Sequence, residues 1–178
     1  MNASFPPPED LQLRYARIQQ LLQEQAADAC LIHSTVNIYY LTGYIFDGYI
    51  YMPQEGEPLF FARKSGAFEH KNIIHIRKPE DIPDVLKQRS ALPNVLALES
   101  DQLTYNEYIR LHALFCPKKT VNATSILRQS RMFKTPWEIE QFRYSAARHR
   151  EAYQKIPALF SPGMTDLDLQ YEIERVMR

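Results

Sequence analysis

Apolar residues recur along this chain with two different spacings, one typical of helices and one of buried strands. After three consecutive prolines, Leu11, Ile18 and Leu21 recur at helical spacing, which predicts a helix over residues 9–26. The compact apolar run DACLIH, residues 28–33, suits a buried strand. The chain therefore opens with a helix followed by a strand.

The next segments predict a short helix and a hairpin. In STVNIYYLTGY, Ser34 or Thr35 can cap a helix that ends near Gly43. Residues 49–63 read as two strands around the turn PQEGEP, because proline and glycine gather there between runs of aromatic and aliphatic residues. A β-hairpin is expected.

Strands and helices then alternate. The further predicted elements are strands at 72–77 and 94–100 and helices at 79–90 and 103–115. This alternation indicates an α/β layer architecture, and the hairpin makes the sheet mixed. We expect one α/β domain over residues 1–130.

A new helix is specified at TPWE. Thr135 can cap the N–H of Glu138, Pro136 fits the first helical position, and Pro157 is expected to end the helix by residue 156. A second capped helix begins at Thr165 and meets no glycine or proline before the sequence stops. Both helices carry an apolar stripe, and we expect the surface that would cover these stripes to be missing. Because the second helix has no stop signal, we also expect that the chain is cut inside a helix.

Composition and charge exclude several classes of protein. The 178 residues are 45% apolar, which suits a folded core, and 21 basic residues balance 21 acidic ones. No leader peptide or long apolar run is present, so we expect a cytoplasmic protein with no nucleic-acid or membrane partner. Cys30 and Cys116 lie far apart among apolar neighbours and are expected to be buried, reduced thiols.

Local motifs assign no chemistry. The five glycines cannot form a dinucleotide or phosphate-binding loop, and GxSxG, HExxH and CxxC are absent. The five histidines have no metal-site spacing; His33, at a strand end, is expected to bond a local carbonyl rather than a ligand. The tyrosines between residues 39 and 51 could form a nucleic-acid platform, but neutral charge favours a core or interface cluster.

Three motifs together carry a family resemblance. YLTGY, then RMFKTPWEI, then GMTDLD resemble the N-terminal part of the pita-bread metallopeptidases, which include Xaa-Pro dipeptidase (prolidase), aminopeptidase P and creatinase. The matching positions are residues 40–44, then Arg131, Lys134, Thr135, Glu138 and Ile139, then Gly163, Met164, Thr165, Asp166 and Asp168. Their order and spacing over nearly the whole chain make the resemblance specific.

The resemblance implies a fold and an activity. It implies a mixed β-sheet flanked by helices, as in the ribonuclease H-like creatinase/prolidase N-terminal domain, with residues 131–178 as a linker and the first two helices of a truncated catalytic domain. Two Asp, one His and two Glu of that domain bind two divalent metal ions, typically manganese, and all would lie beyond Arg178. The parent protein is expected to cleave Xaa-Pro bonds, whereas this chain alone is expected to hold no metal and to be inactive.

The resemblance also implies a role for this part of the protein. It is expected to form a homodimer and partly to close the partner's active site through the loop YIFDGYIY. Asp47 is the candidate for attracting a substrate's amino terminus, with Tyr44 and Tyr49 beside it; the alternatives are a turn aspartate that bonds the backbone near Gly48 and tyrosines that only pack. Two alternative functions stay open: a peptide-binding module without metal ligands, and a creatinase-like amidinohydrolase.

Overall fold

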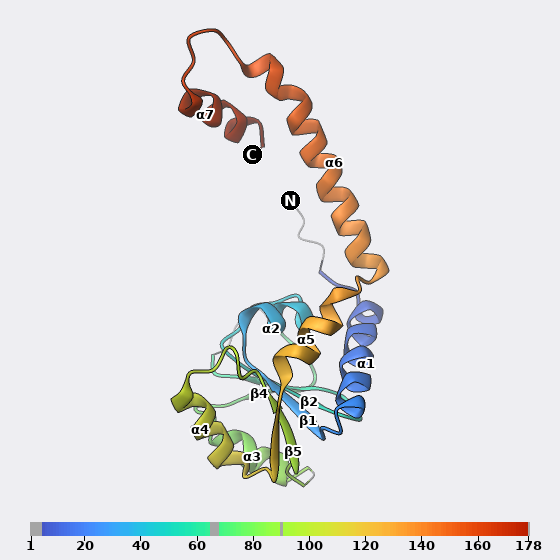
Figure 1. Ribbon diagram of the computed structural model, residues 1–178. Helices are drawn as coiled ribbons and strands as arrows, with labels where there is room; N and C mark the ends of the chain where they lie inside the picture. The colour runs from blue at the N-terminus through green and yellow to red at the C-terminus, as the bar shows by residue number, and fades with distance from the viewer. Residues whose placement is uncertain (1–4, 65–67, 90, 178) are drawn as a thin grey trace. The chain divides into compact units, whose positions relative to one another are not determined.

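The computed structural model describes residues 5–64, 68–89 and 91–177 (Figure 1). These residues belong to two compact units, Met1–Phe133 and Lys134–Arg178. The first unit contains, in chain order, α1 (Pro8–Glu24), β1 (Ala29–Ile32), α2 (Thr35–Thr42), β2 (Gly48–Pro53), β3 (Leu59–Ala62), β4 (Ile73–His75), α3 (Asp81–Lys87), β5 (Val95–Leu98), α4 (Tyr105–Phe115), β6 (Lys119–Asn122) and α5 (Ala123–Met132).

The strands form a single mixed sheet in the order β4-β3-β2-β1-β5-β6. Strand β2 runs antiparallel to β1 and β3, whereas the pairs β1–β5, β3–β4 and β5–β6 are parallel. The predicted hairpin is therefore β2–β3, and the mixed α/β fold expected from the sequence is confirmed.

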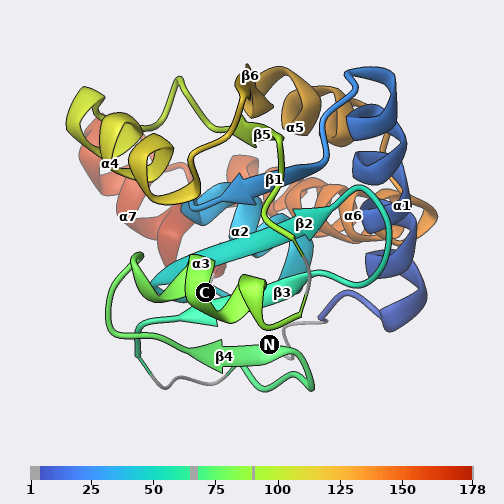
Figure 2. The same cartoon turned by 90° about the horizontal axis from the view of Figure 1, so that it is seen from below.

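Helices cover both faces of this sheet (Figure 2). Helices α1, α2 and α5 pack against one face and α3 and α4 against the other. Strand β1 is buried on both sides, because Cys30 and Ile32 point into the first cluster while Ala29 and Leu31 point into the second. This explains why its sequence is a continuous apolar run rather than an alternating one.

The turn after α2 depends on Gly43. This glycine has φ 74°, in the left-handed region, and its N–H donates to the carbonyl of Tyr39 at 2.7 Å. A Cβ at this position would also lie 2.6 Å from the ring of Pro6. The YLTGY motif thus ends a helix with the one residue type that the backbone allows.

Helix α4 begins with a capping box that offers a stability test. Glu107 N–H donates to Thr104 Oγ1 at 3.3 Å, and Thr104 N–H donates to Glu107 Oε2 at 2.9 Å. We expect Thr104→Ala to lower the free energy of unfolding by about 1 kcal/mol in urea denaturation, because the Glu107 N–H loses its acceptor and the Glu107 carboxylate loses the hydroxyl donor. Thr104→Ser keeps the hydroxyl and should stay close to the wild type; equal losses in both variants would exclude the cap as the cause.

Three details of the first unit differ from the sequence predictions. Strand β6 and helix α5 were not predicted, because β6 is a short edge strand with no fully buried residue and α5 has few large apolar residues. Cys30 is buried as expected, but Cys116 is exposed. Phe115 takes the buried position at the end of α4, which leaves Cys116 in the following turn.

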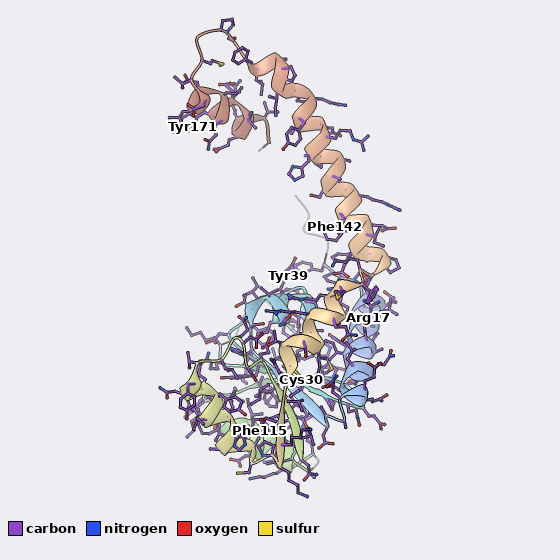
Figure 3. All side chains as sticks on the ribbon, in the orientation of Figure 1. Arg17, Cys30, Tyr39, Phe115, Phe142 and Tyr171 are labelled. Carbon is purple, nitrogen blue, oxygen red and sulfur yellow. The ribbon has the colours of Figure 1, made fainter. Side chains whose placement is uncertain are left out.

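The second unit contains two helices, α6 (Pro136–Leu159) and α7 (Asp166–Met177), and Figure 3 shows Phe142 and Tyr171 on them. The capping box between Thr135 and Glu138 is present as predicted, and Thr165 and Asp168 form the matching pair before α7. The prediction that Pro157 ends α6 was wrong. Proline lacks an N–H donor and crowds the preceding turn, but the residues after it keep their own N–H donors, and α6 continues to Leu159. In the described part of the chain, no helix is long and apolar enough to cross a bilayer.

Candidate functional site

A pocket of about 380 Å³ lies at the carboxyl end of β1, where the segments after β1 and β3 meet the start of β2 and helix α4. Since β1, β3, β4, β5 and β6 all run in one direction, this is the edge of the sheet at which open α/β proteins commonly bind ligands. Its lining includes the polar side chains of His33, Asp47, Tyr49, Arg63, Glu107 and Arg110.

Two of the three residues singled out from the sequence line this pocket. Asp47 and Tyr49 contribute to its wall, whereas Tyr44 does not. The ring of Tyr44 stacks on Phe5 with centroids 4.5 Å apart and packs against the cluster under α1 and α2. Of the three predicted residues, Tyr44 therefore packs against the core, whereas Asp47 and Tyr49 line the pocket.

Asp47 forms an ion pair that the sequence did not suggest. Its carboxylate accepts a hydrogen bond from the Arg63 guanidinium, and its backbone carbonyl accepts one from the Arg63 N–H at 2.8 Å. Both side chains are nearly half exposed, at 48% and 42%. The Asp47 carboxylate is thus directed to Arg63, which directly follows β3.

Tyr49 supplies a neutral hydroxyl to the same wall. Burial raises its pKa above the usual value for tyrosine, and the nearby Arg63 charge only partly opposes this. Its ring stacks with His33 at a centroid distance of 6.3 Å. Tyr49 therefore stays protonated at neutral pH and can donate a hydrogen bond.

A buried carboxylate, Glu99, holds the turn that carries His33 to the pocket, and the sequence analysis did not identify it. It follows β5 and is 1% exposed. Its Oε2 accepts hydrogen bonds from the His33 N–H at 2.5 Å and the Ser34 N–H at 2.9 Å, and its Oε1 accepts from Ser34 Oγ at 2.7 Å and Asn37 Nδ2 at 2.6 Å. One side chain thus fixes the whole turn between β1 and α2.

These hydrogen bonds decide the charge of Glu99. Burial alone would raise its pKa, but the bonds from His33 and Ser34 outweigh that effect and lower the pKa to about 2. Glu99 is therefore ionised at neutral pH, although it is buried. A sequence signal for this role was present only in its position directly after the apolar strand VLAL.

His33 is oriented by Glu99. Its Nδ1 lies 2.9 Å from Glu99 Oε2, so the expectation that it bonds a local carbonyl was wrong. An ionised carboxylate can only accept a hydrogen bond, so Nδ1 of His33 carries the proton. In the neutral imidazole, Nε2 is then the ring nitrogen without a proton, and His33 lines the pocket. His33 can therefore offer a hydrogen-bond acceptor there when neutral.

The charges around the pocket are balanced. Arg110 binds Glu80 in a bidentate pair at 2.8 and 2.9 Å, and Arg63 binds Asp47. Glu107 keeps a lowered pKa, chiefly because the Thr104 side chain donates to it. A pocket wall with both positive and negative side chains suits a zwitterionic or uncharged ligand and does not suit a polyanion.

The sequence resemblance implies two divalent metal ions for the parent protein. Within residues 5–64, 68–89 and 91–177, no group of three or more His, Cys, Asp or Glu side chains could hold a metal ion. The acidic residues of the pocket are already engaged by arginines or by a helix cap.

Comparison with known proteins gives the family. The family model of the Creatinase/Prolidase N-terminal domain matches residues 14–133. The chain belongs to this family. The match includes the YLTGY motif and ends at the last residue of the first unit. Together with the relatives described next, it confirms the resemblance expected from the sequence.

Two similar proteins match about nine tenths of this chain, and a third matches about two thirds of it. An Xaa-Pro dipeptidase of Lactobacillus helveticus is 24% identical over 174 residues, which cover 89% of this chain and 47% of that protein. The structure of an Xaa-Pro dipeptidase from Bacillus anthracis gives a TM-score of 0.74 at 17% identity, covering 94% of this chain and 49% of that one. The creatinase/prolidase N-terminal domain of an X-Pro dipeptidase from Streptococcus pyogenes gives 0.55 at 21% identity, over 67% of this chain and 98% of that one. The chain spans about half the length of the curated relatives it matches.

Proposed function

We propose that this chain is the non-catalytic N-terminal part of an Xaa-Pro dipeptidase or aminopeptidase, where it forms a homodimer and partly closes the partner subunit's active site. The observation that carries the proposal is the family match over residues 14–133, together with curated relatives named for Xaa-Pro cleavage. A cytoplasmic location is part of the same proposal.

The charges of the pocket support a role beside a peptide substrate. Asp47 presents a half-exposed carboxylate at the pocket, where it can attract the amino terminus of a short peptide. Tyr49 and His33 offer hydrogen-bonding groups on the same wall. In the complete protein, a pair of divalent metal ions held outside this chain would supply the nucleophilic hydroxide.

The reading frame that contains this chain is the first test. If it continues into a second domain with two Asp, one His and two Glu as metal ligands, the peptidase proposal stands. Loss of those ligands would favour the peptide-binding alternative. A creatinase-like activity would be recognised by turnover of creatine and none of Xaa-Pro dipeptides.

Asp47→Asn in the full-length protein tests the gating role. We expect KM for an Xaa-Pro dipeptide to rise roughly two- to fivefold with kcat unchanged, because an exposed ion pair contributes at most about 1 kcal/mol. Asp84→Asn, at an exposed aspartate of α3, serves as the matched control and should leave both constants unchanged. Equal KM values for the wild type and Asp47→Asn would show that the Asp47 carboxylate does not attract the substrate.

A further inference from the structure

A second, smaller hollow of about 130 Å³ lies over the carboxyl ends of β1, β5 and β6. It sits between the first turns of α2 and α5, and its polar lining consists of Ser34, Asn37, Gln102, Thr124, Arg128 and Arg131. Val36 adds an apolar surface. None of these residues belongs to the lining of the larger pocket at Asp47.

Two buried polar atoms in the lining residues have no hydrogen-bond partner among the described residues. Asn37 Oδ1 and Thr124 Oγ1 are both unpaired, and their residues are only 7% and 6% exposed. Leaving such an atom unpaired costs about 1–3 kcal/mol, so a molecule that pairs with both is favoured at this place. The two unpaired atoms and the hollow itself both point to an occupant.

The orientation of Asn37 defines what the occupant must offer. Its amide nitrogen already donates to Glu99 Oε1 at 2.6 Å and to Ser34 Oγ at 2.9 Å, so its oxygen is the free end. An amide oxygen only accepts hydrogen bonds, so the occupant has to donate one. The Glu99 carboxylate behind Asn37 adds negative potential, which favours a positively charged donor.

The opposite charge comes from α5. Arg128 and Arg131 both line the hollow, and Arg128 is 65% exposed, with its guanidinium 3.8 Å from Asp101 in a loose ion pair. Arginine binds carboxylates through paired N–H donors. The hollow therefore has a hydrogen-bond acceptor on Asn37, next to the buried Glu99 carboxylate, and positively charged donors on α5.

We propose that this hollow binds a small free α-amino acid as a zwitterion. Its ammonium group donates to Asn37 Oδ1 and Thr124 Oγ1, and its carboxylate faces Arg128 and Arg131. A volume of about 130 Å³ accommodates a few heavy atoms beyond the backbone of an amino acid, so glycine, alanine and proline are the size class. The proposal does not depend on the peptidase function proposed above.

The test measures binding to the full 178-residue chain by calorimetry and by the shift in Tm. The probes are glycine, L-alanine and L-proline at millimolar concentration. Methylammonium, acetate and sulfate at equal ionic strength are the half-ligands, because each carries only one of the two charges of an amino acid. We expect at least one amino acid to bind saturably and raise Tm as its concentration exceeds Kd, while each half-ligand binds at least about fivefold more weakly.

Two variants connect the binding to the hollow. Thr124→Val removes the unpaired hydroxyl without changing the shape of the side chain, so the chain should fold at least as stably as the wild type while its affinity falls about fivefold. Arg128→Gln should weaken binding by a similar factor. Arg89→Gln, at an exposed arginine outside the lining, is the control and should leave the affinity unchanged.

Each remaining outcome contradicts the proposal. Absence of saturable binding by all three amino acids would mean that the hollow holds only water. Equal binding of acetate or sulfate would reduce the site to an anion contact on α5. Amino-acid binding that neither Thr124→Val nor Arg128→Gln weakens would place the ligand elsewhere on the chain.

Discussion

Glu99→Gln is expected to lower the free energy of unfolding by roughly 2–4 kcal/mol at pH 7. The carboxylate is buried and accepts hydrogen bonds from two backbone N–H groups, a hydroxyl and an amide. Glutamine has nearly the same shape but replaces one acceptor oxygen with a donor nitrogen. That nitrogen would face groups that also donate, so buried donors lose their partner.

The same residue predicts a dependence of stability on pH. The pKa of Glu99 is about 2 in the folded chain, against 4.5 for an unperturbed glutamate. A lowered pKa contributes stability that is fully present above pH 4.5 and is lost as the pH falls from 4.5 to 2, with a total of about 3 kcal/mol. The difference in stability between wild type and Glu99→Gln should therefore narrow over that interval.

Urea denaturation between pH 7 and pH 2 measures both effects. Glu24→Gln, at an exposed glutamate of α1, is the matched control and should differ little from the wild type at any pH. A constant difference between wild type and Glu99→Gln across the acidic range would show that Glu99 is not held ionised by its donors.

Gly48→Ala is expected to cost about 3 kcal/mol for a different reason. A Cβ at Gly48 would lie 1.9 Å from the carbonyl oxygen of Phe61, on the neighbouring strand. Backbone cannot move aside as a flexible side chain can, so β2 and β3 would have to separate at the start of the hairpin. The same shift would displace Tyr49 and Arg63 from the pocket.

Gly56→Ala is the matched control for this prediction. Gly56 lies in the hairpin turn with φ 96°, and a Cβ there would meet nothing within 4 Å. Its replacement should cost about 1 kcal/mol, from backbone conformation alone. If chemical denaturation gave Gly48→Ala a loss no larger than that of Gly56→Ala, the close approach of β2 and β3 would not govern this position.

Features encoded locally could be read from the sequence, and features that depend on distant segments could not. The Thr135–Glu138 capping box and the glycine that ends α2 each involve residues within one turn of each other. Glu99 meets His33 only after folding, 66 positions along the chain, and no local pattern distinguishes it from a solvated glutamate. The residue that holds His33 in place was therefore missed, whereas Asp47 and Tyr49 of the pocket lining were found.

Tyr44 and Tyr49 show the same limit within one loop. Both were predicted beside Asp47, but the ring of Tyr44 packs into the core and that of Tyr49 faces the pocket. The difference depends on where α2 ends and β2 begins, and on Phe5, which precedes α1 and stacks on Tyr44. Sequence proximity alone does not set the direction of a side chain.

The position of β1 also determines the order in which the sheet can assemble. The β2–β3 pairing closes a short loop, but β1 must find β5 across the intervening chain, joining Ala29 to Leu96 and Leu31 to Leu98. Closing a longer loop costs more entropy, and folding slows as contacts become more distant in sequence. The hairpin is therefore expected to form early and the β1–β5 ladder late. The turn that carries His33 would then gain its shape only in the last stage of folding, when Glu99 arrives.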